Sequence, residues 1–210
     1  MNTLPDRQRS RAGFAVAVLV VVSLPSVATG LTSTMQSHVL ILIPLLVAVG
    51  VGFGRCLAPA LDGFLDRWNG GGIPGILVTT FTIAFWMIPR WLDASLTNSV
   101  VEWSKHGSLI LLAGVPLALS WDRLHPVARG VVKIEFLSML FRLGWLYLIS
   151  PERFCNNYLL NDQIWLGRGM IIIGIALSIT WLIPVFFGEI TRPVAKDTTA
   201  VMQVGVPDVR

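Results

Sequence analysis

Charged residues are scarce in this chain. Only 13% of its 210 residues are Asp, Glu, Lys or Arg, whereas about a quarter of the residues in a soluble domain are charged. Hydrophobic residues make up 54% of the chain. So few charges cannot cover a surface in contact with water, and disordered chains need even more charge. The composition therefore predicts an integral membrane protein of a single domain.

Cysteine and the familiar catalytic motifs are also scarce or absent. The two cysteines, Cys56 and Cys155, fall on opposite sides of the membrane in the topology derived below, which excludes a disulfide between them. No CxxC, HExxH, GxSxG, Walker or Rossmann pattern occurs. The sequence therefore gives no support to an ordinary hydrolase or a nucleotide-dependent enzyme, and we expect no enzymatic activity.

Long apolar runs are what the chain has in abundance. A helix needs about 20 apolar residues to cross the hydrocarbon core of a bilayer, whereas a barrel strand would alternate apolar and polar residues. We therefore expect an all-α fold, a polytopic transmembrane helical bundle with about six membrane-spanning helices. Residues 1–11 would form a cytoplasmic segment, residues 12–190 the membrane domain and residues 191–210 a cytoplasmic tail. The six runs are 12–29, 38–57, 73–88, 104–121, 131–149 and 169–187.

The residues that flank two of these runs affect the prediction of membrane spans. The third run ends at Pro89, so it is expected to be tilted or to continue past the proline. Gly63 and the glycines of 69–72 predict a flexible loop before that run. The first run, with arginines before it and small residues after it, also fits a cleavable signal peptide. Both readings of the first run place residue 31 onward outside.

The distribution of Lys and Arg predicts the orientation. Of the 16 such residues, eleven lie in segments that are inside if the N-terminus is inside, four lie outside, and Arg142 lies within a run. Positively charged loops remain in the cytoplasm. We therefore expect both termini in the cytoplasm, in the cytoplasmic (inner) membrane. The net charge of +4 then reflects orientation in the lipid bilayer and not nucleic-acid binding.

Two histidines are expected at one level on the outer face. His38 opens the second run and His106 opens the fourth, with Met35 three residues before one and Glu102 four residues before the other. Asp162 lies in the last outer loop. Imidazole with thioether suits copper, and an added carboxylate suits Cu(II) or zinc. These residues predict a metal site, although a histidine at a helix end can also simply bind water or lipid headgroups.

Arg142 falls near the middle of the fifth run. A charge there costs at least about 2.5 kcal/mol on insertion scales, so we expect the side chain to face the bundle and find a partner. Glu135 is about 10 Å away along the helix axis, so a group on another helix is favoured. The arginine would tie the bundle together, or handle a substrate, a proton or a cofactor propionate.

Three stretches together resemble the CtaG-type membrane proteins, which are assembly factors for cytochrome c oxidase. Residues 34–38 resemble the family's His-Met-x-x-His, with Thr34 in place of the first histidine. A second stretch resembles the family's Trp-x-x-Pro, Asp-Ala, His-x-x-x-His, Gly and Trp, with Glu102 in place of the first histidine. The third, Asp162-Gln163 with Gly167, resembles its Asp-Gln-x-x-x-Gly. The second stretch comprises Trp86, Pro89, Asp93, Ala94, Glu102, His106, Gly114 and Trp121.

The resemblance implies a role in the maturation of a respiratory oxidase, with copper handled at the extracytoplasmic face. Two other functions stay open. His38 and His106 could be the axial ligands of one b-type haem, with Arg142 near a propionate, in a membrane redox subunit. Alternatively, the chain is a structural subunit of a membrane complex that holds no cofactor.

Overall fold

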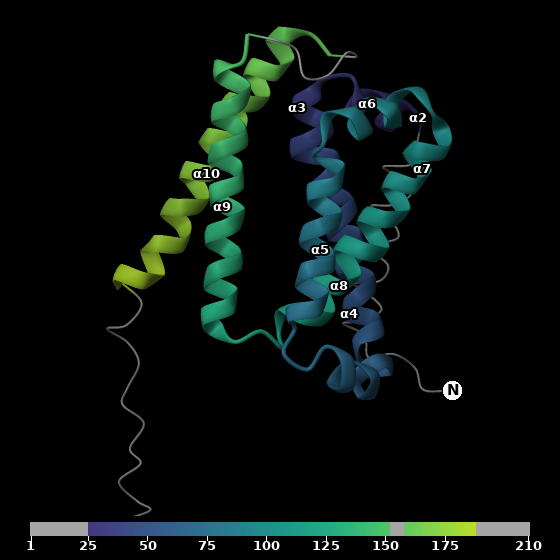
Figure 1. The fold of residues 1–210 in the computed structure, drawn as a ribbon, viewed down its shortest axis with the longest axis vertical. Coiled ribbons are helices and arrows are strands. Elements are labelled where there is room, and N and C mark those ends of the chain that lie inside the picture. Colours follow the sequence, from purple (N-terminus) through teal and green to yellow (C-terminus); the bar gives the residue numbers. More distant parts are fainter. Residues whose placement is uncertain (1–24, 152–157, 188–210) are drawn as a thin grey trace, which may run out of the picture. The chain divides into compact units, whose positions relative to one another are not determined.

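The computed structural model describes residues 25–151 and 158–187, and every regular element in these ranges is a helix (Figure 1). The all-α class is therefore confirmed. Most of the first expected run lies outside the described residues, as do the segments 1–11 and 191–210; helix α2 (Pro25–Thr32) covers the end of that run. The chain divides into two compact units, residues 1–174 and residues 175–210. In the second unit only the C-terminal part of one helix is described.

One long helix extends from Met35 to Trp68 and consists of α3 (Met35–Ser37), the π-helical segment η1 (His38–Leu42) and α4 (Ile43–Trp68). Thr34 caps its first turn, because its hydroxyl accepts a hydrogen bond from the Ser37 amide at 3.3 Å. The helix is longer than the expected run 38–57, since it continues past Pro59 through polar residues. The prediction that Gly63 lies in a loop is wrong, because this residue is inside α4.

Each of the other expected runs corresponds to a helix whose start is encoded locally. Gly72, at φ 71°, precedes α5, and the Asn98 side chain accepts a hydrogen bond from the Val100 amide at the start of α7. The His125 ring accepts from the Val127 amide at the start of α9. These helices are α5 (Ile73–Trp86), α6 (Pro89–Thr97), α7 (Ser99–Ser108), π-helical η2 (Leu109–Gly114), α8 (Val115–Trp121), α9 (Pro126–Ile149) and α10 (Leu160–Phe187).

Part of the predicted set of membrane spans is found among the residues that the structure describes. Within the described residues, only Met35–Trp68 and Leu160–Pro184 are long and apolar enough to cross a membrane by themselves. Helices α5 and α6 form a third candidate if they are counted as one broken span, since they bend by 69° at Pro89. Six spans are not confirmed, because the remaining helices carry polar residues within their apolar sequence. These residues include Glu102 and Lys105 in α7, and Lys133, Glu135 and Arg142 in α9.

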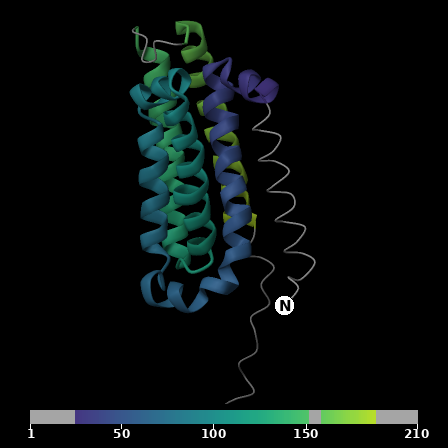
Figure 2. The same cartoon turned by 90° about the vertical axis from the view of Figure 1, so that its right-hand side faces the viewer.

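The continuous η2–α8 segment packs against both α4 and α5 (Figures 1 and 2). The contact between α4 and η2 is made by backbone. A Cβ atom on Gly50 would lie 2.2 Å from the Ile110 carbonyl oxygen, and one on Gly114 would lie 2.4 Å from that of Val47. Small residues let two helices approach this closely, which is the usual way in which membrane helices associate.

Each π-helical segment ends two residues before a proline. The Ile43 amide bonds to the His38 carbonyl and the Val115 amide bonds to the Ile110 carbonyl, each five residues back, and Pro44 and Pro116 follow directly. A proline has no amide to donate, so the helical ladder must change its register there. Widened turns of this kind are frequent at functional sites.

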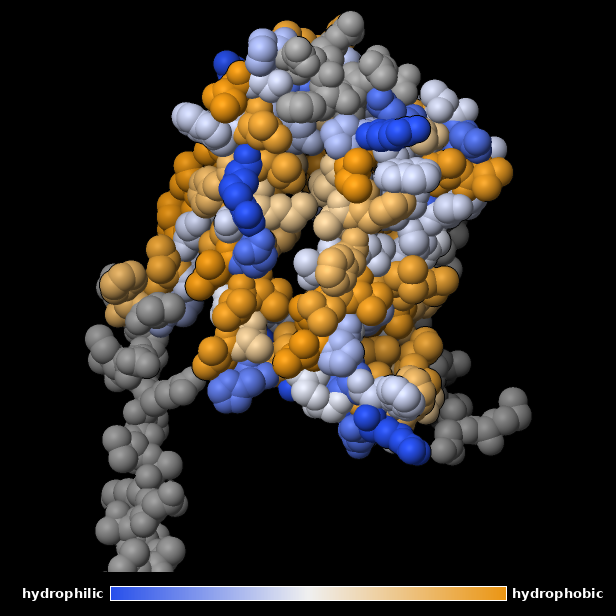
Figure 3. Space-filling model, in the orientation of Figure 1, coloured by the Kyte–Doolittle hydropathy of each residue, from blue (hydrophilic) through white to orange (hydrophobic). Residues whose placement is uncertain are grey.

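Within the first unit, α9 and the N-terminal part of α10 are also joined by glycines. A Cβ atom on Gly144 would lie 3.0 Å from the Gly167 carbonyl oxygen, and one on Gly167 would lie 2.8 Å from that of Gly144. The buried Gln163 amide donates to the Tyr147 carbonyl at 3.4 Å. Hydrophobic side chains cover the flank of the α5 and α8 region in Figure 3, as expected for helices that face lipid.

Candidate functional site

A buried lysine and a buried histidine form the centre of the candidate site. The Lys105 Nζ atom lies 2.7 Å from Nε2 of His38 and 3.0 Å from the Ser95 hydroxyl oxygen. Lys105 and His38 are both 0% exposed, and Ser95 is 2% exposed. The segment η1 and the consecutive helices α6 and α7, which lie far from η1 in the sequence, therefore meet at one ammonium group.

The hydrogen bonds around this lysine have a defined direction. The Ser95 hydroxyl donates to the Leu92 carbonyl at 2.7 Å, so its oxygen accepts from Lys105. The Tyr158 hydroxyl donates to the Thr32 carbonyl at 2.9 Å, so it accepts from His38 Nδ1 at 2.8 Å. An imidazole that donates from Nδ1 and accepts at Nε2 is neutral. The cluster therefore holds one ammonium, and each of its hydrogen-bond partners is neutral.

No carboxylate in the described part of the chain lies within ion-pair distance of Lys105. Glu102, three residues earlier on α7, is half-buried and acts on Lys105 only through its charge at longer range. A buried charge without an ionic partner is expensive, and proteins retain few of them. This lysine is thus the strongest candidate for a functional group.

Lys105 was not predicted as a site residue; it was counted only as one of the four outer charges. The helix begins at Ser99, not at Ser104, so Lys105 lies in its second turn. Lys105, Leu109 and Ala113 follow one another at four-residue spacing, and all three are 0% exposed. That spacing on one apolar face is the signal that could have identified the lysine as buried.

The structure brings some of the predicted site residues together and leaves others apart. His38 lies beside Lys105, and Lys105 directly precedes His106 in the chain. The two predicted histidines therefore lie at the same end of the bundle. His38 is fully buried, not at an open helix mouth as expected. Met35 is 0% exposed, and the His106 Nε2 atom is buried with no hydrogen-bond partner in the described structure.

The carboxylates expected to help do not join this cluster. Glu102 and Asp162 are half-buried in the first turns of α7 and α10, where a negative charge stabilises a helix. Among the described residues, no group of three or more His, Cys, Asp and Glu is arranged to hold a metal ion. Both ring nitrogens of His38 are engaged in hydrogen bonds, so a metal ion would have to displace Lys105 to bind there.

Arg142 has a carboxylate and a backbone carbonyl as partners, as expected, but the prediction that its partner lies on another helix is wrong. Its Nη2 atom lies 2.6 Å from Oε1 of Glu135 on the same helix, and its Nε atom donates to the Ser138 carbonyl at 3.3 Å. Side chains on a helix lean toward its N-terminus, so an arginine can reach back over two turns to a glutamate. Both side chains are about two-thirds exposed, at 65% and 63%.

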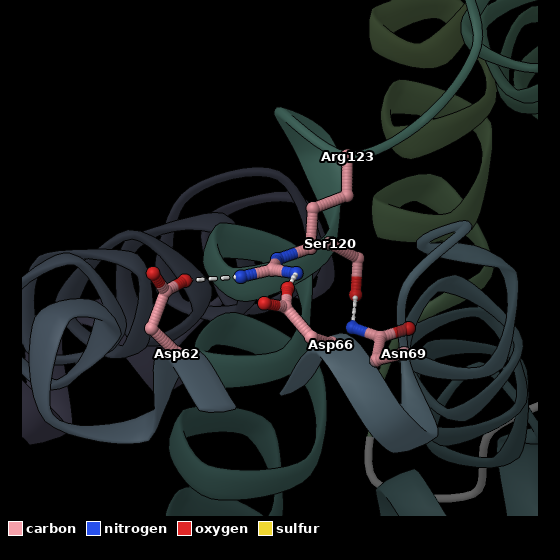
Figure 4. A network of polar contacts seen from close by, with 5 residues as sticks. All are labelled: Asp62, Asp66, Asn69, Ser120 and Arg123. Carbon is pink, nitrogen blue, oxygen red and sulfur yellow. Dashed lines mark hydrogen bonds and ion pairs between the residues drawn. The ribbon is translucent and has the colours of Figure 1, made fainter. Parts of the chain in front are cut away.

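A second polar network lies at the opposite end of α4 and α8 (Figure 4). The Arg123 guanidinium forms ion pairs with Asp62 and Asp66 of α4. The hydrogen bond to Asp66 and the charges of both carboxylates raise the pKa of Arg123 above its ordinary value. The buried Asn69 amide donates to the Ser120 hydroxyl at 2.8 Å. These contacts fasten the C-terminal end of α4 to that of α8.

No known protein family model matches the chain, and no curated protein and no solved structure is found to be similar to it. The geometry of the Lys105 cluster is therefore the basis on which we infer a function.

Proposed function

We propose that this chain is an integral membrane protein that binds and releases a proton at the Lys105–His38 pair. One observation carries the proposal: a fully buried ammonium group is held between two neutral partners, His38 Nε2 and the Ser95 hydroxyl. An ionisable group buried in a membrane protein is by default a candidate for proton or ion handling.

The site has the chemistry for this role. Lysine and histidine are both bases, so the proton between Nζ and Nε2 can reside on either nitrogen. Histidine is the side chain whose charge changes most readily near neutral pH. Transfer of the proton to Nε2 leaves a neutral amine beside an imidazolium, and the total charge of the pair is conserved.

The surrounding hydrogen bonds limit where the proton can leave. The chain from His38 Nδ1 through the Tyr158 hydroxyl ends at the Thr32 carbonyl, which has no proton to pass on and cannot keep one. The Ser95 hydroxyl likewise points to the Leu92 carbonyl. We expect exchange to take place at the Lys105 side of the pair. The π-helical segments η1 and η2, which begin at His38 and four residues after Lys105, are where we expect the helices to open.

The experiment is a pH titration of the purified protein in detergent, followed by NMR of ¹⁵N-labelled lysine and histidine. The chain contains three lysines, so the lysine spectrum is simple. We expect the Lys105 and His38 signals to change together between about pH 5 and pH 10. Lys105→Met should remove the Lys105 signal and change the titration of His38. Lys133→Met, the matched control, should leave the His38 titration unchanged.

The same titration can also reject the proposed proton site. If neither the Lys105 nor the His38 signal changes over this range, the proton is fixed and the pair is a structural tie between η1, α6 and α7. The chain is then better described as a structural subunit of a membrane complex. That outcome would reject the proposed function.

Copper handling for a respiratory oxidase is the second candidate, favoured by the unpartnered Nε2 atom of His106 and the buried Met35. It rests on the resemblance to CtaG-type proteins and requires Lys105 to leave His38. If copper binds, Lys105→Met should strengthen Cu(I) binding and His38→Ala should abolish it in a titration with a competing chelator. If no variant binds copper, this candidate is rejected. The haem alternative meets the same obstacle, because neither ring nitrogen of His38 is free for an axial bond.

The proposed orientation places both termini in the cytoplasm, on the basis of the excess of Lys and Arg in the inner segments. The Lys105 cluster would then lie at the extracytoplasmic end of the bundle. A C-terminal alkaline phosphatase fusion should be inactive, whereas activity would reverse the orientation.

A further inference from the structure

A groove of about 670 Å³ lies between α5 and the α7–η2 segment. This volume is within the range of about 300–1,000 Å³ that is usual for ligand sites. Among the residues that line it are Phe81, Phe85, Trp86, Ser104, Ser108 and Leu112. Phe81 is 72% exposed and Leu112 50% exposed, so the groove is open along the face where lipid is expected.

The polar groups of the groove offer no donor to a ligand. The Thr82 hydroxyl donates to the Val78 carbonyl at 2.8 Å, and the Ser104 hydroxyl donates to the Val100 carbonyl at 2.7 Å. The remaining two donors are also used. The Ser108 hydroxyl donates to the Lys105 carbonyl at 3.1 Å, and the Trp86 indole donates to the Ser108 oxygen at 2.7 Å.

This arrangement selects the chemistry of the occupant. A quinone or a porphyrin carries polar atoms that would remain unpaired in the groove, and such a loss costs about 1–3 kcal/mol per group. A hydrocarbon chain has no polar atoms and loses nothing. The groove therefore fits an acyl chain.

The end of the groove provides a charge for the headgroup. Ile88 lines the groove, and Arg90 follows two residues later in the first turn of α6. Arg90 is exposed, and its guanidinium makes no ion pair or hydrogen bond with the described residues. The ring of Phe85 in the groove wall packs against that of Trp91, with centroids 5.1 Å apart. Trp91 and Trp103 are exposed at this end of the groove. Tryptophan is enriched in membrane proteins at the level of the lipid headgroups.

We propose that this groove binds one acyl chain of an anionic phospholipid, whose phosphate pairs with Arg90. The proposal is independent of the proton site at Lys105. A basic residue at a lipid surface favours an anionic headgroup over a neutral one by a factor of about five. Binding of the acyl chain and recognition of the headgroup are thus separable.

Native mass spectrometry of the purified full chain tests this, with phosphatidylglycerol and phosphatidylcholine of identical acyl chains as the two probes. We expect the wild-type chain to retain phosphatidylglycerol about fivefold better. Arg90→Gln should remove the preference but keep the binding of both lipids. Ala84→Phe and Leu112→Phe, which place a ring in the groove, should each weaken the binding of both lipids.

Arg168→Gln is the matched control, because Arg168 is another exposed arginine that the sequence places outside, 5.2 Å from the Trp165 ring. It should leave the lipid preference unchanged. Equal retention of the two lipids by the wild-type chain would overturn the proposal. Equal losses in the Arg168 and Arg90 variants would also overturn it, since the lipids would then bind to the general surface. Circular dichroism of each variant establishes that it is folded. Ala84→Phe and Leu112→Phe change different walls of the groove, so each tests the binding of the acyl chain independently of the other.

Discussion

The Nζ atom of Lys105 lies 2.7 Å from Nε2 of His38, although the two residues are 67 positions apart in the chain. Both side chains are completely buried. The contact joins the N-terminal part of the helix Met35–Trp68 to the second turn of α7, so we expect a change of either residue to affect the packing at that end of the bundle. It also means that the two partners contribute unequally to stability, because one is charged and the other is neutral.

We predict that His38→Ala destabilises the protein more than Lys105→Met. Removal of the imidazole leaves a buried ammonium with one neutral partner and should cost about 3 kcal/mol. Methionine replaces the lysine with an apolar side chain of similar size and should cost about 1 kcal/mol, since only the His38 acceptor remains unpaired. Denaturant unfolding in detergent measures both values. The double variant should be more stable than His38→Ala alone; a double variant that is less stable contradicts this account.

The second prediction concerns Tyr158, whose hydroxyl bridges His38 Nδ1 and the Thr32 carbonyl. Tyr158→Phe removes both hydrogen bonds and should cost about 1–3 kcal/mol. NMR of the ¹⁵N-labelled histidine ring should show the Nδ1–H tautomer in the wild-type protein. Observation of the Nε2–H tautomer would show that Lys105 does not donate to this ring.

The helices were largely predictable from the sequence because their signals are local. Apolar density identified the helices α4, α5, α9 and α10 and the η2–α8 segment, but not the less apolar α6, which follows the bend at Pro89. The boundaries were less accurate. Gly63 has nothing within 4 Å of its Cβ position and no neighbour that requires a turn, so the helix α4 simply continues through it.

The site was only half predictable, because it depends on contacts between distant segments. His38 was selected for its position at a helix start, and it does lie in the cluster. Lys105 was counted only as one of the four outer charges, because a charge at the end of an apolar run normally marks the membrane edge. For Arg142, the length of two extended side chains was underestimated, so the partner was sought on another helix although Glu135 was within reach.

The third prediction concerns the glycine contact between α4 and η2. Gly50→Ala places a methyl group 2.2 Å from the Ile110 carbonyl oxygen, which forces the helices apart and should cost about 1–3 kcal/mol or more. Gly63→Ala is the matched control in the same helix, because its Cβ would meet open space. It should stabilise the protein by about 0.5–1 kcal/mol through helix propensity alone. Equal effects of the two substitutions on the unfolding midpoint would show that the close approach is not present.

The fourth prediction concerns the ion pair of Glu135 and Arg142, which α9 carries on an exposed face. If this face lies against lipid, either charge alone is costly, at about 2.5–3.5 kcal/mol on insertion scales, whereas the pair is neutral. Glu135→Gln or Arg142→Gln alone should therefore reduce the amount of full-length protein recovered from membranes. The double variant should restore that amount, because it removes both charges together. Glu135→Asp should behave like Glu135→Gln, since the contact spans seven residues and a shorter side chain cannot reach the guanidinium. If the double variant is recovered no better than the single ones, this face of α9 is in water or against another protein, and the two charges act independently.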